Sequence, residues 1–197
     1  MEFLQSTDTD LFLFLNGMQS DFLDPIMYWL SHKLFWIPMY LLIAFVIIRR
    51  YRMRGVLMLV LIGLVITLCD QTASNLLKDW VQRLRPSHEP TLAGLVELSK
   101  AGPGGRFGFV SSHSANVFGL ASFLYFVLDK PFKWLKYWLF VWAFLVAYSR
   151  IYNGVHYPGD VVVGGLIGFA YGFLMAKAYF ALDAYLLKRA TKSTELK

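Results

Sequence analysis

Cysteine is almost absent from this chain of 197 residues, since Cys69 is the single one and it lies inside an apolar run. A disulfide framework and a cysteine-based metal site are therefore excluded. Charged residues are also scarce, at 16% of the sequence, whereas hydrophobic residues make up 57% and the mean hydropathy is +0.49. Because a soluble surface needs more polar residues than this, the composition predicts a membrane-embedded protein.

The first ten residues, MEFLQSTDTD, lack the features of a removable signal peptide. They contain no basic residue and no short apolar run that ends in a small-residue cleavage site. We therefore expect the first membrane span to act as the export signal.

The basic residues that give a net charge of +6 do not form the stripe, interleaved with aromatic residues, that is typical of a nucleic-acid-binding protein. They cluster instead at the ends of apolar runs. The three clusters are Arg49, Arg50, Arg52 and Arg54; Lys130, Lys133 and Lys136; and Lys188, Arg189 and Lys192. Under the positive-inside rule all three are expected in the cytoplasm. The predicted partner is the lipid bilayer and not nucleic acid.

Five apolar runs approach the roughly 20 residues that a membrane-spanning helix needs. They cover about residues 34–48, 55–77, 112–128, 134–148 and 160–182. An earlier stretch, residues 10–31, is apolar but is interrupted by Asn16-Gly17, Asp21, Asp24 and Pro25, which favours one or two interfacial helices over a further span.

The predicted fold is therefore all-α, a polytopic membrane helix bundle of five spans plus N-terminal interfacial helices. The sequence shows no internal repeat and no low-complexity tract, so we expect residues 1–197 to form a single membrane-embedded domain. Within it, residues 1–33 form the interfacial segment.

Two links between predicted spans are expected on the outer face of the membrane once the basic clusters are placed inside. These links are residues 78–111 and 149–159. The first is much longer than a connection between neighbouring helices requires, and long ordered loops are usually functional.

Three polar segments end on this outer face: KDWVQRLRP (78–86), FVSSHSAN (109–116) and SRIYNGVHYPGD (149–160). Ionisable groups in such apolar sequence persist mainly where they face water, one another or a ligand. The segments supply the cations Lys78, Arg85 and Arg150, the donors Ser111 and Ser112, the histidines His113 and His156, and the carboxylate Asp160. Several fixed cations with paired N–H donors suit a phosphate group.

The local pattern also predicts where two helices begin. The glycine-rich run GPGGRFG leads into a helix start near Ser112, whose backbone N–H groups can face an anion. Pro158 starts the last span and puts Asp160 in its first turn. A carboxylate there can orient His156 as a nucleophile, while His113 protonates the leaving oxygen.

These motifs resemble the type 2 phosphatidic acid phosphatase family of integral-membrane lipid phosphatases, over roughly residues 50–180. The family's first motif, Lys, six residues and Arg-Pro, is met from Lys78 to Pro86. The second, Pro-Ser-Gly-His, is matched by residues 110–113 with departures at Val110 and Ser112. The third, Ser-Arg, five residues, His, three residues and Asp, is matched in full from Ser149 to Asp160.

The resemblance implies a role for each motif residue. His156 would attack phosphorus and form a phosphohistidine, Asp160 would orient it, and His113 would protonate the leaving group. The phosphate would be bound by Lys78, Arg85, Arg150, Ser111 and Ser112. No metal and no other cofactor is implied. A site at the outer face of the cytoplasmic (inner) membrane is expected to hydrolyse a lipid phosphate or diphosphate, with undecaprenyl diphosphate favoured over phosphatidylglycerol phosphate, phosphatidic acid and lipid A phosphate.

Other interpretations remain open from the sequence. A lipid phosphotransferase would use the same histidine with a hydroxyl acceptor, and a non-enzymatic lipid-phosphate binding or transport protein would need the cations alone. Zinc bound by His113, His156 and Asp160 is a further alternative, although the nearby cations would repel it. The remaining polar residues of the outer links are interpreted as interfacial: Arg83, His88, Glu89, Lys100 and Arg106.

Overall fold

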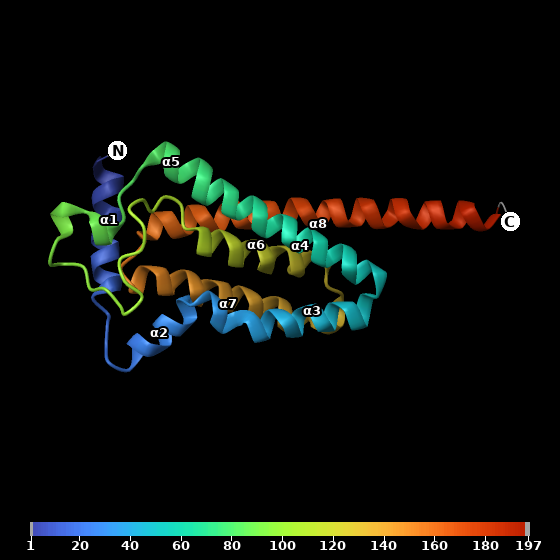
Figure 1. Cartoon of the computed structure of the whole chain (residues 1–197), viewed down its shortest axis with the longest axis horizontal. Coiled ribbons are helices and arrows are strands. Elements are labelled where there is room, and N and C mark those ends of the chain that lie inside the picture. The colour runs from blue at the N-terminus through green and yellow to red at the C-terminus, as the bar shows by residue number, and fades with distance from the viewer. Residues whose placement is uncertain (1, 196–197) are drawn as a thin grey trace.

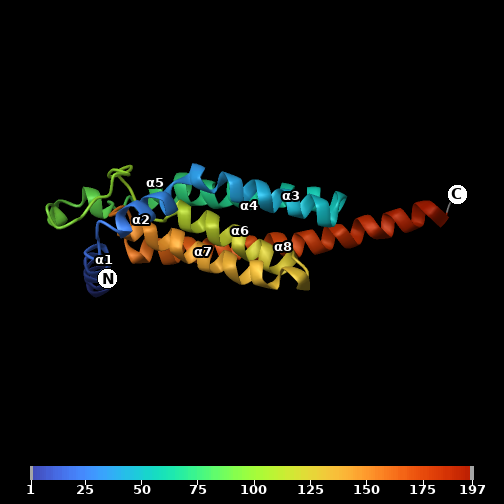
Figure 2. The same cartoon turned by 90° about the horizontal axis from the view of Figure 1, so that it is seen from below.

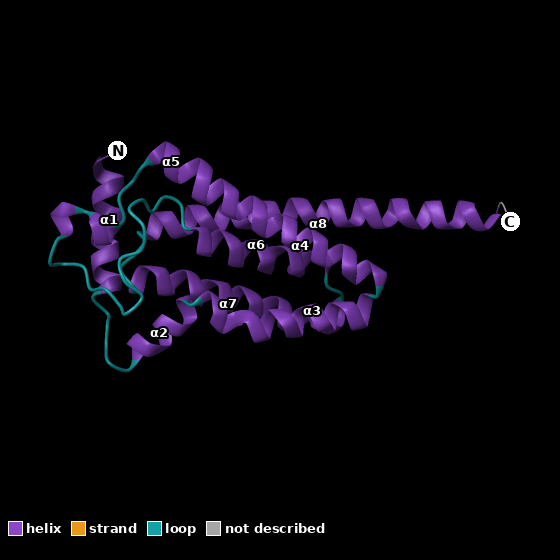
Figure 3. Cartoon of the chain, viewed as in Figure 1, coloured by secondary structure: helices purple, strands orange, loops and turns teal. Residues whose placement is uncertain are grey.

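The computed structural model describes residues 2–195, and its regular structure is helical, as Figure 3 shows. Residues 1, 196 and 197 of the predicted domain lie outside the described residues. The helices are α1 (Glu2–Asn16), α2 (Leu23–Ser31), α3 (Ile37–Tyr51), α4 (Met53–Gln71), α5 (Lys78–Val81), α6 (Ser112–Val127), α7 (Lys133–Tyr152) and α8 (Pro158–Glu195). The prediction of an all-α protein is confirmed.

Helices α3, α4, α6, α7 and α8 run roughly along one axis and form a bundle, and α8 extends well beyond it (Figures 1 and 2). Among the described residues, three segments are long and apolar enough to cross a membrane: Lys33–Tyr51, Met53–Val81 and Pro158–Arg189. They coincide with three of the five predicted spans. The other two, in α6 and α7, stay predictions, because α6 has only 16 residues and α7 begins with Lys133 and Lys136.

Close approach of α6 and α8 forms the centre of the bundle. Gly164, Gly168 and Gly172 recur every four residues on α8 and face α6; a Cβ atom at Gly168 would lie only 2.0 Å from the carbonyl oxygen of Ala115. Small residues at this spacing let two helix backbones pack closely, which is what drives helix association in lipid. This stripe was missed in the sequence analysis, although its period of four residues is visible there.

The first two basic clusters lie together at one end of the bundle, the right-hand end in Figure 1, and the third lies on the part of α8 that extends beyond that end. Arg50 Nη2 lies 2.7 Å from Asp129 Oδ2, which joins the α3–α4 turn to the α6–α7 link. Arg54 Nε lies 2.8 Å from Asp183 Oδ1 on α8. These contacts support the expectation that the α3–α4 turn and the α6–α7 link share one side with the C-terminal half of α8.

The N-terminal helices and the loop 82–111 lie at the opposite end of the bundle (Figures 1 and 2). The chain breaks after Asn16, as predicted, but the side chain of Asn16 is buried and fixes this end of the fold. Its Nδ2 donates to the carbonyl oxygens of Glu97 and Tyr152 at 2.9 and 2.8 Å, and its Oδ1 accepts from the Glu97 amide at 2.9 Å. Helix α1 is thereby attached to the long loop and to the end of α7.

Candidate active site

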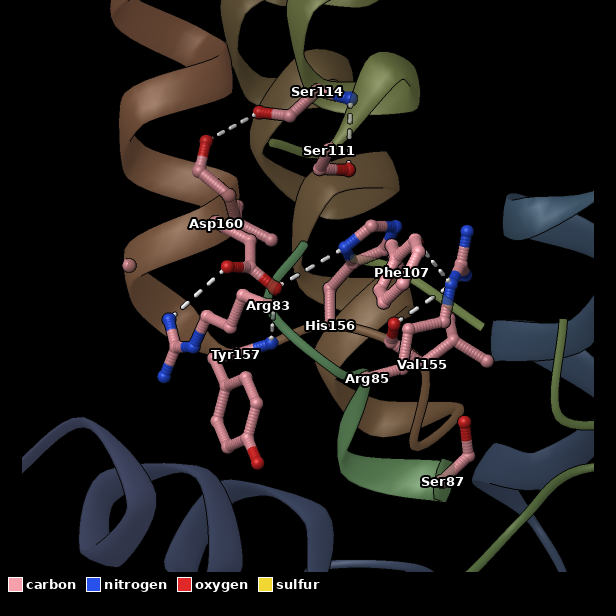
Figure 4. Close-up of polar contacts among 12 residues, drawn as sticks. Arg83, Arg85, Ser87, Phe107, Ser111, Ser114, Val155, His156, Tyr157 and Asp160 are labelled. Atoms are coloured by element: carbon pink, nitrogen blue, oxygen red, sulfur yellow. Dashed lines mark hydrogen bonds and ion pairs between the residues drawn. The ribbon is translucent and has the colours of Figure 1, made fainter. Parts of the chain in front are cut away.

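A buried pair formed by His156 and Asp160 lies at the start of α8, with His156 just before the helix and Asp160 in its first turn, as drawn in Figure 4. The Nδ1 atom of His156 lies 3.4 Å from Oδ2 of Asp160, and the same oxygen accepts a hydrogen bond from the Tyr157 amide at 3.1 Å. The helix begins at Pro158, as predicted, and places Asp160 four residues after His156. Both side chains are almost completely buried. With Nδ1 directed at the carboxylate, Nε2 is the nitrogen left for chemistry.

The other carboxylate oxygen of Asp160 is bound by Arg83, which corrects the interfacial interpretation of that residue. Arg83 Nη1 lies 3.1 Å from Asp160 Oδ1, and Nη2 lies 2.8 Å from Oδ2 of Asp8 on α1. The guanidinium carbon also lies 3.8 Å from the centre of the Tyr157 ring. A buried carboxylate needs such a partner, which is why Arg83 points inward and not toward lipid headgroups.

Arg85 is placed by pairing of residues 83–85 with residues 106–108. The amide of Arg85 donates to the Arg106 carbonyl oxygen at 3.1 Å, and an isolated β-bridge joins Leu84 to Phe107. Its side chain donates from Nε to the Phe107 carbonyl oxygen at 3.1 Å and from Nη1 to that of Val155 at 3.4 Å, as Figure 4 shows. These bonds hold the guanidinium beside the residue that precedes His156.

The glycine-rich loop passes directly over this arginine. At Gly104, where φ is +71°, an added Cβ atom would lie 2.7 Å from Arg85 Nη1, and at Gly108 it would lie 3.1 Å from Asp160 Oδ2. Glycine is favoured at Gly104 because of its positive φ, and at Gly108 a larger residue would have to push Asp160 or Arg85 aside. The run GPGGRFG therefore shapes the site and does more than lead into α6.

Helix α6 begins at Ser112, as the sequence predicts, and its start is joined to the start of α8. The Oγ atom of the N-cap residue Ser111 accepts from the Ser114 amide at 3.4 Å. The Ser111 amide donates to the Asp160 carbonyl oxygen at 3.0 Å, and Ser114 Oγ donates to that of Val161 at 2.7 Å (Figure 4). His113 consequently lies in the first turn of α6, close to the His156 region.

Arg150 lies in the last turn of α7 and not in a loop. The sequence placed residues 149–159 in an outer link, but α7 continues to Tyr152. The chain turns only after the end of α7, at Gly154, which has a φ of +75°. Arg150 Nη1 donates to the hydroxyl of Ser31 at the end of α2, a contact that no local pattern predicted. Within the described residues, the buried Nε atom of Arg150 has no hydrogen-bond partner.

Lys78 is the third predicted cation, and it lies on a helix that continues from α4. A π-helical stretch, Thr72–Leu77, directly precedes it, and such stretches are frequent at functional sites. The charges of Lys78, Arg85 and Arg150 all act on His156. Burial lowers the pKa of the His156 ring well below 6.5, and these cations lower it further, so the imidazole is neutral at physiological pH.

A cavity of about 600 Å³ lies beside His113, between α3, α4, α6 and α7. Its walls are mostly apolar, and the residues that line it include Tyr40, Ile43, Ile62, Val117 and Trp142. The polar residues Ser31, Lys33 and His113 also line it. Lys33 and Ser31 border a second cavity, of about 380 Å³, which is also lined by Arg150.

Within the described part of the chain, no three His, Cys, Asp or Glu side chains gather where they could hold a metal ion. His156 and Asp160 contact each other, while the further partners of Asp160 are Arg83 and the Tyr157 amide. The positive charge of Arg83, 3.1 Å from Asp160 Oδ1, would repel a dication bound to that carboxylate.

Comparison with known proteins agrees with this geometry. Residues 54–183 match the PAP2 superfamily. The chain belongs to that superfamily. It is 43% identical over 176 residues to a lipid A 4'-phosphatase of Bacteroides thetaiotaomicron, covering 88% of this chain and 77% of the relative. It is 34% identical over 182 residues to a lipid A 4'-phosphatase of Porphyromonas gingivalis, covering 91% and 75%.

A solved structure is also similar, that of a transmembrane PAP2-type phosphatidylglycerolphosphate phosphatase from Bacillus subtilis. It superimposes with a TM-score of 0.66 at 27% identity, over 89% of this chain and 85% of the other. The protein is thus an integral-membrane lipid phosphatase of the PAP2 superfamily, whose enzymes are metal-independent. The family resemblance seen in the sequence motifs is confirmed.

Proposed function

We propose that this PAP2 protein removes a phosphate group from a membrane lipid through a phosphohistidine on His156. The observation that carries the proposal is the buried His156–Asp160 pair, 3.4 Å apart, among three cations and beside an apolar cavity. Binding alone needs no oriented neutral histidine, so the pair argues against a lipid-phosphate carrier. The roles of the site residues below belong to this proposal.

In the first step, Nε2 of His156 forms a bond to phosphorus while the bond from phosphorus to the lipid oxygen breaks. Asp160 accepts the hydrogen bond from Nδ1–H and stabilises the positive charge that develops on the ring. His113, whose protonated form is favoured by the negative charge of the bound phosphate, gives a proton from its imidazolium to the departing lipid oxygen and becomes neutral. In the second step, water attacks phosphorus, His113 takes a proton from it, and the bond to Nε2 breaks to release phosphate.

The cations Lys78, Arg85 and Arg150 bind the phosphate oxygens and stabilise the charge spread over them in the transition state. The α6 start adds donors, with the Ser112 backbone N–H directed by the helix and the Ser111 hydroxyl beside it. A phosphotransferase is the alternative reaction, which would share the first step and use a lipid hydroxyl in place of water in the second. The water-accepting reaction is favoured by the relatives, which are named as phosphatases.

The substrate proposed first is lipid A phosphate, because the two relatives named above act on lipid A by name. The sequence alone had favoured undecaprenyl diphosphate, which now takes second place. The apolar cavity beside His113 supports a lipid of either kind, since its α4 wall runs from Gln71 to Leu59, roughly 18 Å of helix rise for acyl or prenyl carbons.

The test is phosphate release by the purified protein in detergent from a panel of lipids at equal concentration. The panel contains lipid A, undecaprenyl diphosphate, phosphatidylglycerol phosphate and phosphatidic acid. The highest kcat/KM is expected for lipid A. A higher value for undecaprenyl diphosphate restores the preference indicated by the sequence, and release from none of them overturns the proposed function.

Phosphate release is expected to continue without added metal and to survive EDTA, because fixed cations balance the phosphate charge. Vanadate is expected to inhibit, since in its five-coordinate form it resembles the transition state and bonds to Nε2 of His156. The measurement is the initial rate in each condition. Loss on chelation that zinc or magnesium restores would contradict this expectation.

We place the active site on the outer, periplasmic side of the cytoplasmic membrane, with α6 and α7 completing five spans. The positive-inside rule supports this orientation, because the arginine-rich α3–α4 turn and the lysine-rich α6–α7 link contact each other at the end away from His156. The amphipathic α1 and α2 would then lie at the outer interface.

A cysteine introduced at the exposed Lys100 is expected to react in intact cells with a membrane-impermeant thiol reagent. One introduced at Lys133 is expected to react only after the membrane is opened. Native Cys69 is fully buried and should stay unlabelled, which keeps the background low. The reverse labelling pattern would place the site in the cytoplasm.

A further inference from the structure

The side chain of Asp8 on helix α1 contacts two parts of the candidate active site. Its Oδ2 atom lies 2.8 Å from Arg83 Nη2, and its Oδ1 atom accepts from the Gly159 amide at 2.7 Å. Gly159 belongs to the first turn of α8, whose amides have no partner within the helix. Asp8 thus caps α8 from another helix while it binds Arg83.

We propose that Asp8 and Arg83 are positioning residues that hold the Asp160 carboxylate in the orientation His156 requires. This inference rests on the proposed phosphohistidine function. It adds an arginine that the family motifs in this sequence do not include and a carboxylate from α1, which precedes the matched residues 54–183.

The two oxygens of Asp160 have separate partners, which is the first support for the proposal. Oδ1 faces Arg83 at 3.1 Å, whereas Oδ2 faces His156 Nδ1 at 3.4 Å and the Tyr157 amide at 3.1 Å (Figure 4). A carboxylate held at only one oxygen can rotate about its Cβ–Cγ bond. With Arg83 on the far oxygen, this rotation would break an ion pair.

Arg83 is itself fixed on three sides. Nη1 faces Asp160, Nη2 faces Asp8, and the guanidinium plane lies over the Tyr157 ring with its central carbon 3.8 Å from the ring centre. Its side chain is only 22% exposed. An arginine with both terminal nitrogens bound to protein carboxylates is not available to bind a phosphate, which separates its role from that of Arg85.

Charge supplies the second support. Asp160 is fully buried, and a buried carboxylate without a cation is strongly disfavoured. Arg83 supplies this cation at 3.1 Å from Asp160 Oδ1, and Asp8 balances the arginine in turn at 2.8 Å. The chain Asp8–Arg83–Asp160–His156 therefore runs from α1 to Nδ1 of His156, on the opposite side of the ring from the nitrogen proposed to attack.

The test compares Arg83→Gln, Arg83→Lys and Asp8→Asn with two controls, Asp10→Asn on the same helix and Arg106→Gln on the same loop, both with exposed side chains. Arg83→Gln is expected to lower kcat about 100-fold with KM nearly unchanged, because the nucleophile is misplaced while the phosphate cations remain. Arg83→Lys should recover part of the loss. Asp8→Asn should cost about 10-fold, and the controls should match the native protein.

The double variant Asp8→Asn/Arg83→Gln is expected to be no worse than Arg83→Gln, because both changes interrupt one chain of contacts. If the losses in kcat of the two single variants multiply in the double variant, or if KM rises at constant kcat, the positioning role is overturned. If Arg83→Gln fails to fold in detergent, the kcat and KM values of Arg83→Lys and Asp8→Asn test the positioning role, which again requires a loss in kcat at nearly constant KM. Absence of phosphate release by the native protein would instead count against the proposed function, so the two failures are distinguishable.

Discussion

Replacing His156 with glutamine is expected to lower the rate of phosphate release by about 10⁴-fold or more, because the attacking nitrogen is lost. Glutamine is the sharpest choice, since its amide N–H can still donate to Asp160 while its other atom is an oxygen without nucleophilic character. The neutral state of His156 at physiological pH makes its Nε2 lone pair available in the native protein.

The measurement is single-turnover release of labelled phosphate together with trapping of an acid-labile phosphoenzyme. The native protein should yield the phosphoenzyme and the glutamine variant should not, although it still binds the lipid phosphate through Lys78, Arg85 and Arg150. Activity of the variant within 10-fold of native would remove the nucleophile assignment. Loss of lipid binding would indicate that the side chain serves the fold of the site.

Replacing His113 with glutamine is expected to slow hydrolysis of lipid phosphates by about 10²- to 10⁴-fold, the range for removal of a general acid. His113 lies at the start of α6, within electrostatic reach of His156, Arg150 and Lys33, and it lines the apolar cavity. This position is where the lipid oxygen would depart if the tail occupied the cavity.

An aryl phosphate with a good leaving group, such as p-nitrophenyl phosphate, separates proton donation from other roles. Its phenolate departs without a proton, so its phosphorylation of His156 should be little affected in the His113→Gln variant. The ratio of the two substrates' kcat/KM values is therefore the quantity to measure. An equal loss for both would assign His113 to phosphate binding or to folding.

The motifs determined much of the site in advance because local rules apply to them. Pro158 and the glycine-rich run before Ser112 predicted two helix starts, and these starts bring His113 and His156 to one end of the bundle. The basic clusters likewise predicted which turns share a side. In each case the signal lies within a few residues, where backbone sterics, capping and charge act directly.

The tertiary structure alone decided which residues surround His156 and Asp160. Arg83 is 77 residues from Asp160, and Asp8 is 151 residues from Gly159, so no periodicity or spacing in the sequence relates them. An arginine at the end of an apolar segment is ordinarily a headgroup anchor, and only the fold of α1 against α8 turns Arg83 inward. The apolar cavity is also a product of the way four helices pack, since its walls combine residues from α3 to α7. Local chemistry therefore predicted the groups that we propose to react, whereas long-range packing determined the residues that contact them and the shape of the apolar cavity.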